Sequence, residues 1–105
     1  MSTSEKRLAM LEKITQGGSK DPFAWYGLAL EYKGLGRVDD ALAAFTTLRS
    51  QSPEYVAMYL MCGQMLAELS RTEDAREWFE AGVAAARAKR DSHALSELEG
   101  ALAAL

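Results

Sequence analysis

A segment of this chain recurs after a shift of 34 residues. Residues 35–45 align with residues 69–79 and share five of their eleven positions, in the pattern Leu-x-Arg-x-x-Asp-Ala-x-x-x-Phe. In the same register, large residues upstream align with large ones and small with small: Trp25 with Tyr59, Leu28 with Cys62, Ala29 with Gly63 and Tyr32 with Leu66. A repeat of this length is typical of a supersecondary unit that buries its apolar face by stacking on further copies.

The residues within and between the repeated segments indicate helix along almost the whole chain. Alanine, leucine, glutamate, lysine and arginine dominate, and apolar residues recur every three or four positions. Glycines, prolines and short polar stretches divide this pattern. We predict six helices, at residues 3–16, 22–34, 38–50, 54–69, 72–89 and 92–104. Because the connections are short, neighbouring helices should run antiparallel.

A set of residues in the first repeat carries a family resemblance. In order they are Trp25, Leu28, Ala29, Tyr32, Ala41, Phe45 and Pro53. Together with the period, this order closely resembles the tetratricopeptide repeat. The resemblance implies an all-α fold, a right-handed superhelix of antiparallel helix hairpins. There are two departures, since Ala29 replaces the usual glycine and Arg87 stands at the place equivalent to Pro53.

The length of the chain sets its domain organisation. A chain of 105 residues suffices for one modest core, so we expect a single domain over residues 1–105. Two repeats alone leave apolar faces open, and about three stacked units are needed for stability. We therefore expect four parts: an N-terminal cap helix in 1–21, repeats in 22–55 and 56–89, and a C-terminal capping helix in 90–105.

The two flanking helices have sequence features that suit caps. Ser2 and Glu5 predict a capping box at the start of the first helix. Its expected apolar stripe consists of Leu8, Leu11 and Ile14. Asp91 or Ser92 can cap the last helix. The expected stripe of that helix consists of Leu95, Leu98, Leu102 and Leu105.

Small side chains recur at matching positions of the two repeats. Ala29 and Gly63 should lie where the two helices of a hairpin approach most closely, and Ala41 and Ala75 where the second helix meets its neighbours. The large residues expected to fill the space around them are Trp25, Tyr59, Phe45 and Phe79. This alternation of small and large predicts where the core lies.

The residues that could carry catalysis are few. His93 is the only histidine and Cys62 the only cysteine, so neither a zinc cluster nor a catalytic dyad is predicted. Cys62 occupies an apolar position of the repeat, and His93 is expected on the surface. Acidic pairs such as Asp39 and Asp40 begin helices, where the helix dipole stabilises them. We predict a non-catalytic protein without metal or cofactor; an enzyme or small-molecule binder using His93, Tyr26 and Tyr32 is a remote alternative.

Charge and hydropathy exclude several classes of partner. The formal net charge is −3 and both signs are interspersed, which argues against a nucleic-acid surface. Apolar runs are far shorter than the roughly 20 residues that cross a bilayer. A single cysteine excludes an internal disulfide and suits a reducing compartment. We expect a cytoplasmic protein that binds neither nucleic acid nor membrane.

The family resemblance also implies a binding surface. In tetratricopeptide folds the first helix of each hairpin lines a concave groove that takes a partner peptide or helix. The groove residues implied here are Phe23, Tyr26, Leu30, Lys33, Ala57, Leu60, Gln64 and Ala67. The clamp that holds chaperone C-termini in some members needs lysine, arginine and asparagine at positions occupied here by Tyr26, Leu30, Met61, Asp91 and Leu95. The resemblance therefore implies an apolar groove for a protein partner other than a chaperone tail.

Two alternatives remain open for the same apolar face. The chain's own terminal helix or a second copy of the protein can cover the groove. In the second case the protein is a homodimer, and assembly is its function. The stripe from Leu95 to Leu105 offers another surface for self-association.

Overall fold

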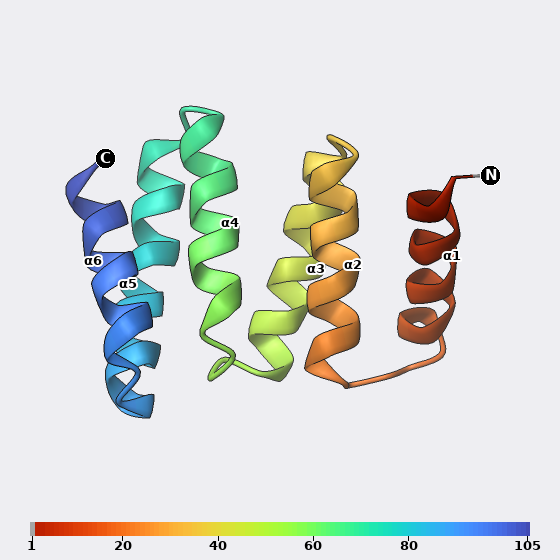
Figure 1. Cartoon of the computed structure of the whole chain (residues 1–105), viewed down its shortest axis with the longest axis horizontal. Coiled ribbons are helices and arrows are strands. Elements are labelled where there is room, and N and C mark those ends of the chain that lie inside the picture. Colours follow the sequence, from red (N-terminus) through yellow and green to blue (C-terminus); the bar gives the residue numbers. More distant parts are fainter. Residues whose placement is uncertain (1) are drawn as a thin grey trace. The chain divides into compact units, whose positions relative to one another are not determined.

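The computed structural model describes residues 2–105, which contain six α-helices and no strand. The helices are α1 (Thr3–Gln16), α2 (Pro22–Gly34), α3 (Val38–Gln51), α4 (Ala57–Glu68), α5 (Thr72–Lys89) and α6 (Ser92–Ala103) (Figure 1). The predicted all-α fold class is confirmed. Most helix ends agree with the prediction to within one residue.

The start of α4 differs from the prediction by three residues. The sequence placed it at residue 54, but the helix begins at Ala57. Pro53 and Glu54 form a turn. The carbonyl oxygen of Pro53, which would accept the first bond of a helix beginning at 54, accepts a hydrogen bond from the Tyr59 hydroxyl (2.6 Å). The proline turn is thus held by a side chain of the helix that follows it.

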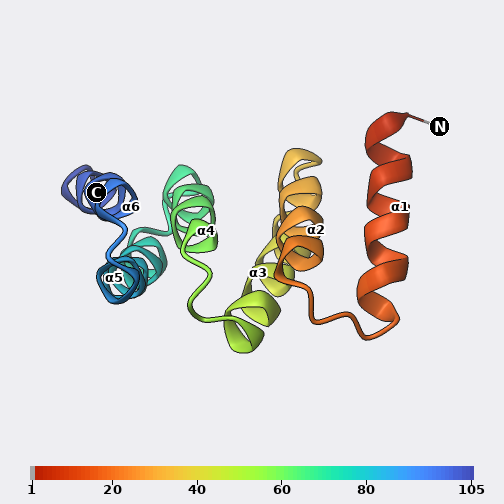
Figure 2. The same ribbon diagram turned by 60° about the horizontal axis from the view of Figure 1, so that its bottom comes forward.

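The helices form two compact units, each described here by itself. The first comprises the described residues up to Ser52 and contains α1, α2 and α3; the second runs from Pro53 to Leu105 and contains α4, α5 and α6. In the first unit, α2 packs against both α1 and α3. In the second, α5 packs against both α4 and α6 (Figure 2). Helix α4 also contacts α6. Each unit is therefore one helix hairpin with one flanking helix.

Helix caps follow the sequence closely. The Ser2 hydroxyl accepts a hydrogen bond from the Glu5 amide (3.1 Å), and the Glu5 carboxylate accepts one from the Ser2 amide (3.4 Å), so the predicted capping box is confirmed. Asp21 caps α2 through the Phe23 amide. Of the two candidates at α6, Asp91 is the cap, because its carboxylate accepts from the Ala94 amide (3.0 Å). These contacts satisfy backbone donors that a helix start leaves without a partner.

The small residues lie in the core as predicted. Ala29, Ala41 and Ala75 are fully buried, and so is Phe45. The repeated Arg-x-x-Asp element also has one structure in both repeats. It forms ion pairs of 2.9 Å at the start of α3 and of α5 (Arg37 with Asp40, Arg71 with Asp74). The sequence repeat is thus a repeat of local structure.

The predicted stripe of α1 needs one correction. Leu8 is buried, but Ile14 is 42% exposed. Thr15 occupies the buried position that was predicted for Ile14. The spacing explains the difference, because a residue seven positions after Leu8 returns to the same face of a helix and one six positions after it does not. Thr15 satisfies its hydroxyl by donating to the Leu11 carbonyl (2.8 Å). A polar residue therefore completes this apolar face.

The last helix packs against α5 and α4 of its unit. Leu98 is only 1% exposed, and the other leucines of the stripe are half-buried. The contact depends on Gly82 of α5, a position that the sequence analysis did not single out. A Cβ atom on Gly82 would lie 2.8 Å from the Leu98 Cδ2 atom and 2.6 Å from the Tyr59 Cβ atom. The missing side chain lets α6 and α4 approach α5.

Candidate functional site

The predicted groove positions of the first unit lie along α2. Phe23 is 73% exposed, and Tyr26, Leu30 and Lys33 are half-buried. The opposite side of the helix buries Ala24, Leu28 and Ala29. An aromatic ring with this much exposed surface is a typical anchor for a partner, since aromatic side chains dominate interface energetics.

The predicted groove positions of the second unit lie along α4. Ala57 and Gln64 are exposed, whereas Leu60 and Ala67 are half-buried. The buried side of this helix consists of Met58, Tyr59, Cys62, Gly63, Met65 and Leu66. The helical period therefore separates the four predicted residues from the core, as it does in α2.

A cavity of about 400 Å³ lies beside two of these residues. Its lining comes from α4, α5 and the end of the chain: Gln64, Ala67, Glu68, Phe79, Ala101, Ala104 and Leu105. Small and apolar side chains form most of its walls, and Gln64 and Glu68 supply the polar groups. Glu68, Ala101 and Ala104 were not predicted to line this surface, because only the leucine stripe of the last helix, which includes Leu105, was expected to make contacts. Ala101 and Ala104 follow Leu98 at intervals of three residues, and this spacing could have indicated that the last helix lines a cavity.

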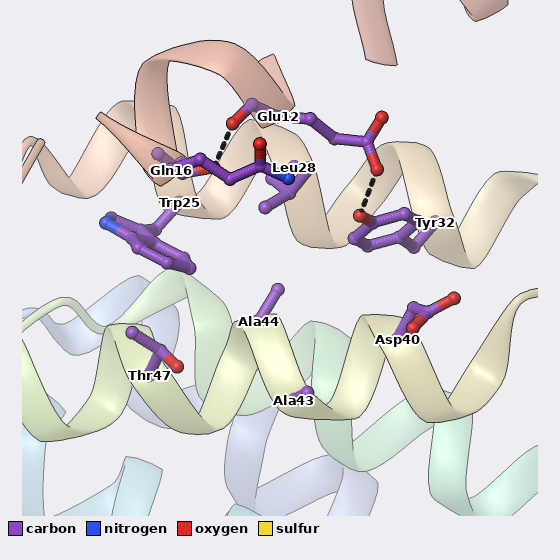
Figure 3. Close-up of a pocket in the computed structure, with 10 residues that line it drawn as sticks. Glu12, Gln16, Trp25, Leu28, Tyr32, Asp40, Ala43, Ala44 and Thr47 are labelled. Atoms are coloured by element: carbon purple, nitrogen blue, oxygen red, sulfur yellow. Dashed lines mark hydrogen bonds between the residues drawn. The ribbon is translucent and has the colours of Figure 1, made fainter. Parts of the chain in front are cut away.

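A second cavity, of about 230 Å³, lies between α1, α2 and α3 (Figure 3). It was not predicted. Its lining residues are Glu12, Thr15, Gln16, Trp25, Leu28, Tyr32, Asp40, Ala43, Ala44 and Thr47. The Tyr32 hydroxyl donates to the Glu12 carboxylate (2.6 Å). Burial, followed by the hydrogen bond to Glu12 and its negative charge, raises the pKa of Tyr32 to about 12.

Arginine and aspartate flank the same tyrosine. The Arg37 guanidinium lies 4.6 Å from the centre of the Tyr32 ring, within range of a cation–π interaction. Arg37 also pairs with Asp40 at 2.9 Å. The charge of Asp40 is therefore compensated within the first unit, whereas Glu12 receives a neutral phenol donor.

Of the residues considered for catalysis, Tyr32 and Asp40 line the cavity of the first unit, whereas His93, Tyr26 and Cys62 line neither of the two cavities described above. The His93 side chain is 89% exposed, and its Nε2 atom lies 3.2 Å from the Glu97 carboxylate. Cys62 is buried. The basic residues Arg87, Lys89 and Arg90 are exposed at the end of α5. Within residues 2–105, no group of three or more histidine, cysteine, aspartate or glutamate side chains is placed to hold a metal ion.

None of the helices in the described part of the chain combines the length and the apolarity that crossing a bilayer requires.

Comparisons with known proteins agree with the repeat architecture. A family model described as tetratricopeptide repeat matches residues 26–91. The chain is similar to a solution NMR structure of a tetratricopeptide repeat domain protein from Salinibacter ruber, with 36% sequence identity, a TM-score of 0.74, and coverage of 78% of this chain and 83% of that one. A crystal structure of a tetratricopeptide repeat domain protein from the same organism gives 36% identity, a TM-score of 0.72, and coverage of 78% and 92%. No curated protein matches at a significant level. The chain therefore belongs to the tetratricopeptide repeat family.

Proposed function

We propose that this protein is a non-catalytic interaction module that binds a peptide or helix of a partner protein through an exposed helix face of each unit, that of α2 in the first and that of α4 in the second. Domains of this family generally mediate protein–protein interaction. The observation that carries the proposal is the cavity of about 400 Å³ in the second unit, because two of the residues implied by the family resemblance, Gln64 and Ala67, line it. The exposed ring of Phe23 on α2 offers a second apolar contact.

The lining of this cavity indicates what kind of segment it takes. Ala67, Ala101 and Ala104 are small, and Phe79 and Leu105 add apolar surface. An aliphatic side chain of a partner would bury its surface there, at roughly 25 cal/mol per Å². The Gln64 amide can both donate and accept hydrogen bonds, so it suits the backbone of a bound peptide. We therefore propose an apolar, extended or amphipathic segment as the ligand.

The expected affinity is modest. The surfaces of α2 and α4 are short, and area alone does not ensure tight binding, because association costs translational and side-chain entropy. We expect an isolated peptide to bind with micromolar or weaker affinity.

Site-specific photo-cross-linking tests this proposal. A benzoylphenylalanine residue in place of Ala104, at the cavity, should cross-link a partner in the native cytosol, and mass spectrometry of the product would identify the bound segment. The same cross-linker in place of Ala84, an exposed position of α5, is the matched control. The double variant Tyr26→Glu, Leu60→Glu should abolish the Ala104 cross-link while helicity is retained. A cross-link that is equally strong at both positions, or that persists in the double variant, would show that the partner does not bind these helix faces.

Self-association is the second candidate function. The 73% exposure of Phe23 favours it, because a symmetric pair of such surfaces would bury both rings. Light scattering at high micromolar concentration separates the two functions. A monomer would exclude the homodimer, and a dimer that the double variant disrupts would support it. For either function we propose a cytoplasmic location, since a single cysteine excludes an internal disulfide and suits a reducing compartment.

A further inference from the structure

The cavity of the first unit lies at a position where the first repeat has a small residue and the second repeat a large one. Ala44 of α3 corresponds to Trp78 of α5 after the shift of 34 residues. Trp78 is 7% exposed, and its ring packs at a tilt against Tyr59, with 6.0 Å between the ring centres. Tyr59 corresponds in turn to Trp25, which lines the cavity of the first unit. A large indole thus covers the aromatic ring in the second repeat, whereas a methyl group leaves space in the first.

This cavity is elongated along α2. Trp25 and Tyr32 are seven residues apart, about two turns, so roughly 10 Å of helix separates their Cα atoms. Figure 3 shows the two rings toward opposite ends of the cavity, with Leu28 and Ala44 between them. Leu28 and Ala44 give the middle of the cavity apolar walls on α2 and α3, which suit an unbranched carbon chain, whereas the polar Gln16 lines it from α1 (Figure 3).

One end of the cavity carries a net negative charge. Glu12 and Asp40 lie near Tyr32 at this end (Figure 3). Asp40 is paired with Arg37, but within residues 2–105 no lysine or arginine forms an ion pair with Glu12. The Glu12 carboxylate accepts from the neutral Tyr32 hydroxyl and has further lone pairs for a cation. In a partly enclosed cavity, where the effective dielectric constant is lower than in water, such a carboxylate attracts a cation more strongly than on an open surface.

From these observations we infer that the cavity between α1, α2 and α3 binds a primary alkylammonium group on an unbranched carbon chain, the chemistry of a lysine side chain or of a free aliphatic amine. The ammonium lies at Glu12, and the chain runs past Leu28 and Ala44 toward Trp25. The volume of about 230 Å³ is below the roughly 300–1,000 Å³ of sites for drug-sized ligands, so one side chain or small amine fills it. A guanidinium suits the site less well, because Arg37 already covers Tyr32 and pairs with Asp40. This site is distinct from the partner surfaces proposed on α2 and α4, because none of the predicted groove residues lines it.

The two tryptophans provide a built-in test of this binding. Trp25 lines the cavity and Trp78 belongs to the other unit, so their indole N–H signals in a nitrogen-15 NMR spectrum report separately. The probes are Nα-acetyl-lysine N-methylamide and the norleucine analogue, which has the same carbon chain without the ammonium. We expect saturable shifts of Trp25 but not of Trp78, with the lysine compound binding about tenfold more tightly, the effect of one charge-assisted contact.

Two variants identify the groups involved. Glu12→Gln keeps an acceptor for the Tyr32 hydroxyl and removes the charge, so the lysine compound should bind no better than the norleucine compound. Ala44→Leu fills the space that Trp78 fills in the second repeat, so neither compound should shift Trp25. If Ala44→Leu does not fold, Glu12→Gln still tests the proposal, because it changes no apolar packing.

A comparison of two further ligands shows whether the ammonium group belongs to a lysine side chain of a partner or to a free amine. A five-residue peptide with one central lysine is measured against 1,5-diaminopentane, and the tighter binder tells whether the site takes a partner's side chain or a free amine. Either result supports the proposal. Equal binding of the lysine and norleucine compounds to the wild type, equal shifts of Trp78, or unchanged lysine binding in Glu12→Gln would overturn it.

Discussion

The ring of Phe79 lies directly against the backbone of Gly63. A Cβ atom on Gly63 would overlap this ring, with the Cζ atom at 2.9 Å. In the first repeat the same place holds Ala29, which is fully buried and faces a hairpin that accommodates its methyl group. The two hairpins therefore follow one pattern but differ in how closely their helices approach at this point.

The first prediction concerns this contact. Gly63→Ala should lower the free energy of unfolding by up to about 2 kcal/mol, because overpacking costs about 1–3 kcal/mol and the better helix propensity of alanine returns only about 1 kcal/mol. Urea denaturation followed by circular dichroism measures the change. Gly100→Ala is the matched control, since a Cβ there meets nothing within 4 Å, and it should stabilise α6. Equal effects of the two substitutions would show that the Phe79 ring yields easily.

The second prediction concerns the turn after α4. Ser70 has a φ of 61°, and its counterpart Gly36 after α2 has a φ of 74°. Both helix ends share one hydrogen-bond pattern, in which Arg37 and Arg71 donate to carbonyls five residues earlier at 2.9 Å. A side chain in this left-handed conformation costs about 1–2 kcal/mol, more than the chain entropy that glycine loses.

Ser70→Gly should therefore stabilise the protein by roughly 0.5–1 kcal/mol. The urea midpoint measures this change. Gly36→Ser, the reverse exchange in the first repeat, should destabilise by a similar amount. A fall in stability with Ser70→Gly would mean that the serine side chain has a role in this turn that outweighs its backbone strain.

The third prediction concerns pH. Folding raises the pKa of Tyr32 from its ordinary value of 10 to about 12, mainly through burial and then through the bond to Glu12. Between pH 10 and about 12, the Tyr32 hydroxyl is therefore protonated in the folded state and ionised in the unfolded state. The stabilisation is complete below pH 10 and is lost as the pH rises from 10 to about 12.

Absorbance of tyrosinate near its ultraviolet maximum, measured during an alkaline titration, should show a late-titrating component that Tyr32→Phe removes. Glu12→Gln should lower the pKa of Tyr32 part of the way toward its ordinary value, because burial, the larger cause, remains. A titration that is the same in wild type and Tyr32→Phe would contradict the assignment.

The fourth prediction concerns the last helix. Leu98→Ala should destabilise the second unit by about 2–5 kcal/mol, because it leaves a cavity at the most buried residue of α6. Hydrogen exchange should accelerate in α6 first. Leu102→Ala, at a half-buried position of the same helix, is the control and should have a smaller effect. If exchange in α4 and α5 accelerates as much as in α6, the last helix is part of one cooperative unit rather than a separable cap.

Much of the fold could be predicted because it is encoded locally. The 34-residue repeat and the caps at Ser2 and Asp91 depend on residues close together in the chain, so spacing alone indicates them. The buried face of α1 contains Thr15 where the sequence predicted Ile14, and this difference shows the limit of this reasoning. Threonine is classed as a polar residue. The Thr15 hydroxyl, however, donates a hydrogen bond to the Leu11 carbonyl of the same helix, so the methyl group of the side chain can pack in the core.

The cavities beside Ala67 and Trp25, in contrast, depend on the tertiary structure. The sequence by itself determined the helices, the family and the residues on the outer faces of α2 and α4. Only packing decided that Gly82 admits Leu98 so closely, that the end of α6 walls a cavity beside Ala67, and that Ala44 leaves a space beside Trp25. A cavity is the volume left between side chains of several helices, and its size depends on how closely their backbones approach. Residue identity along one helix does not contain that distance.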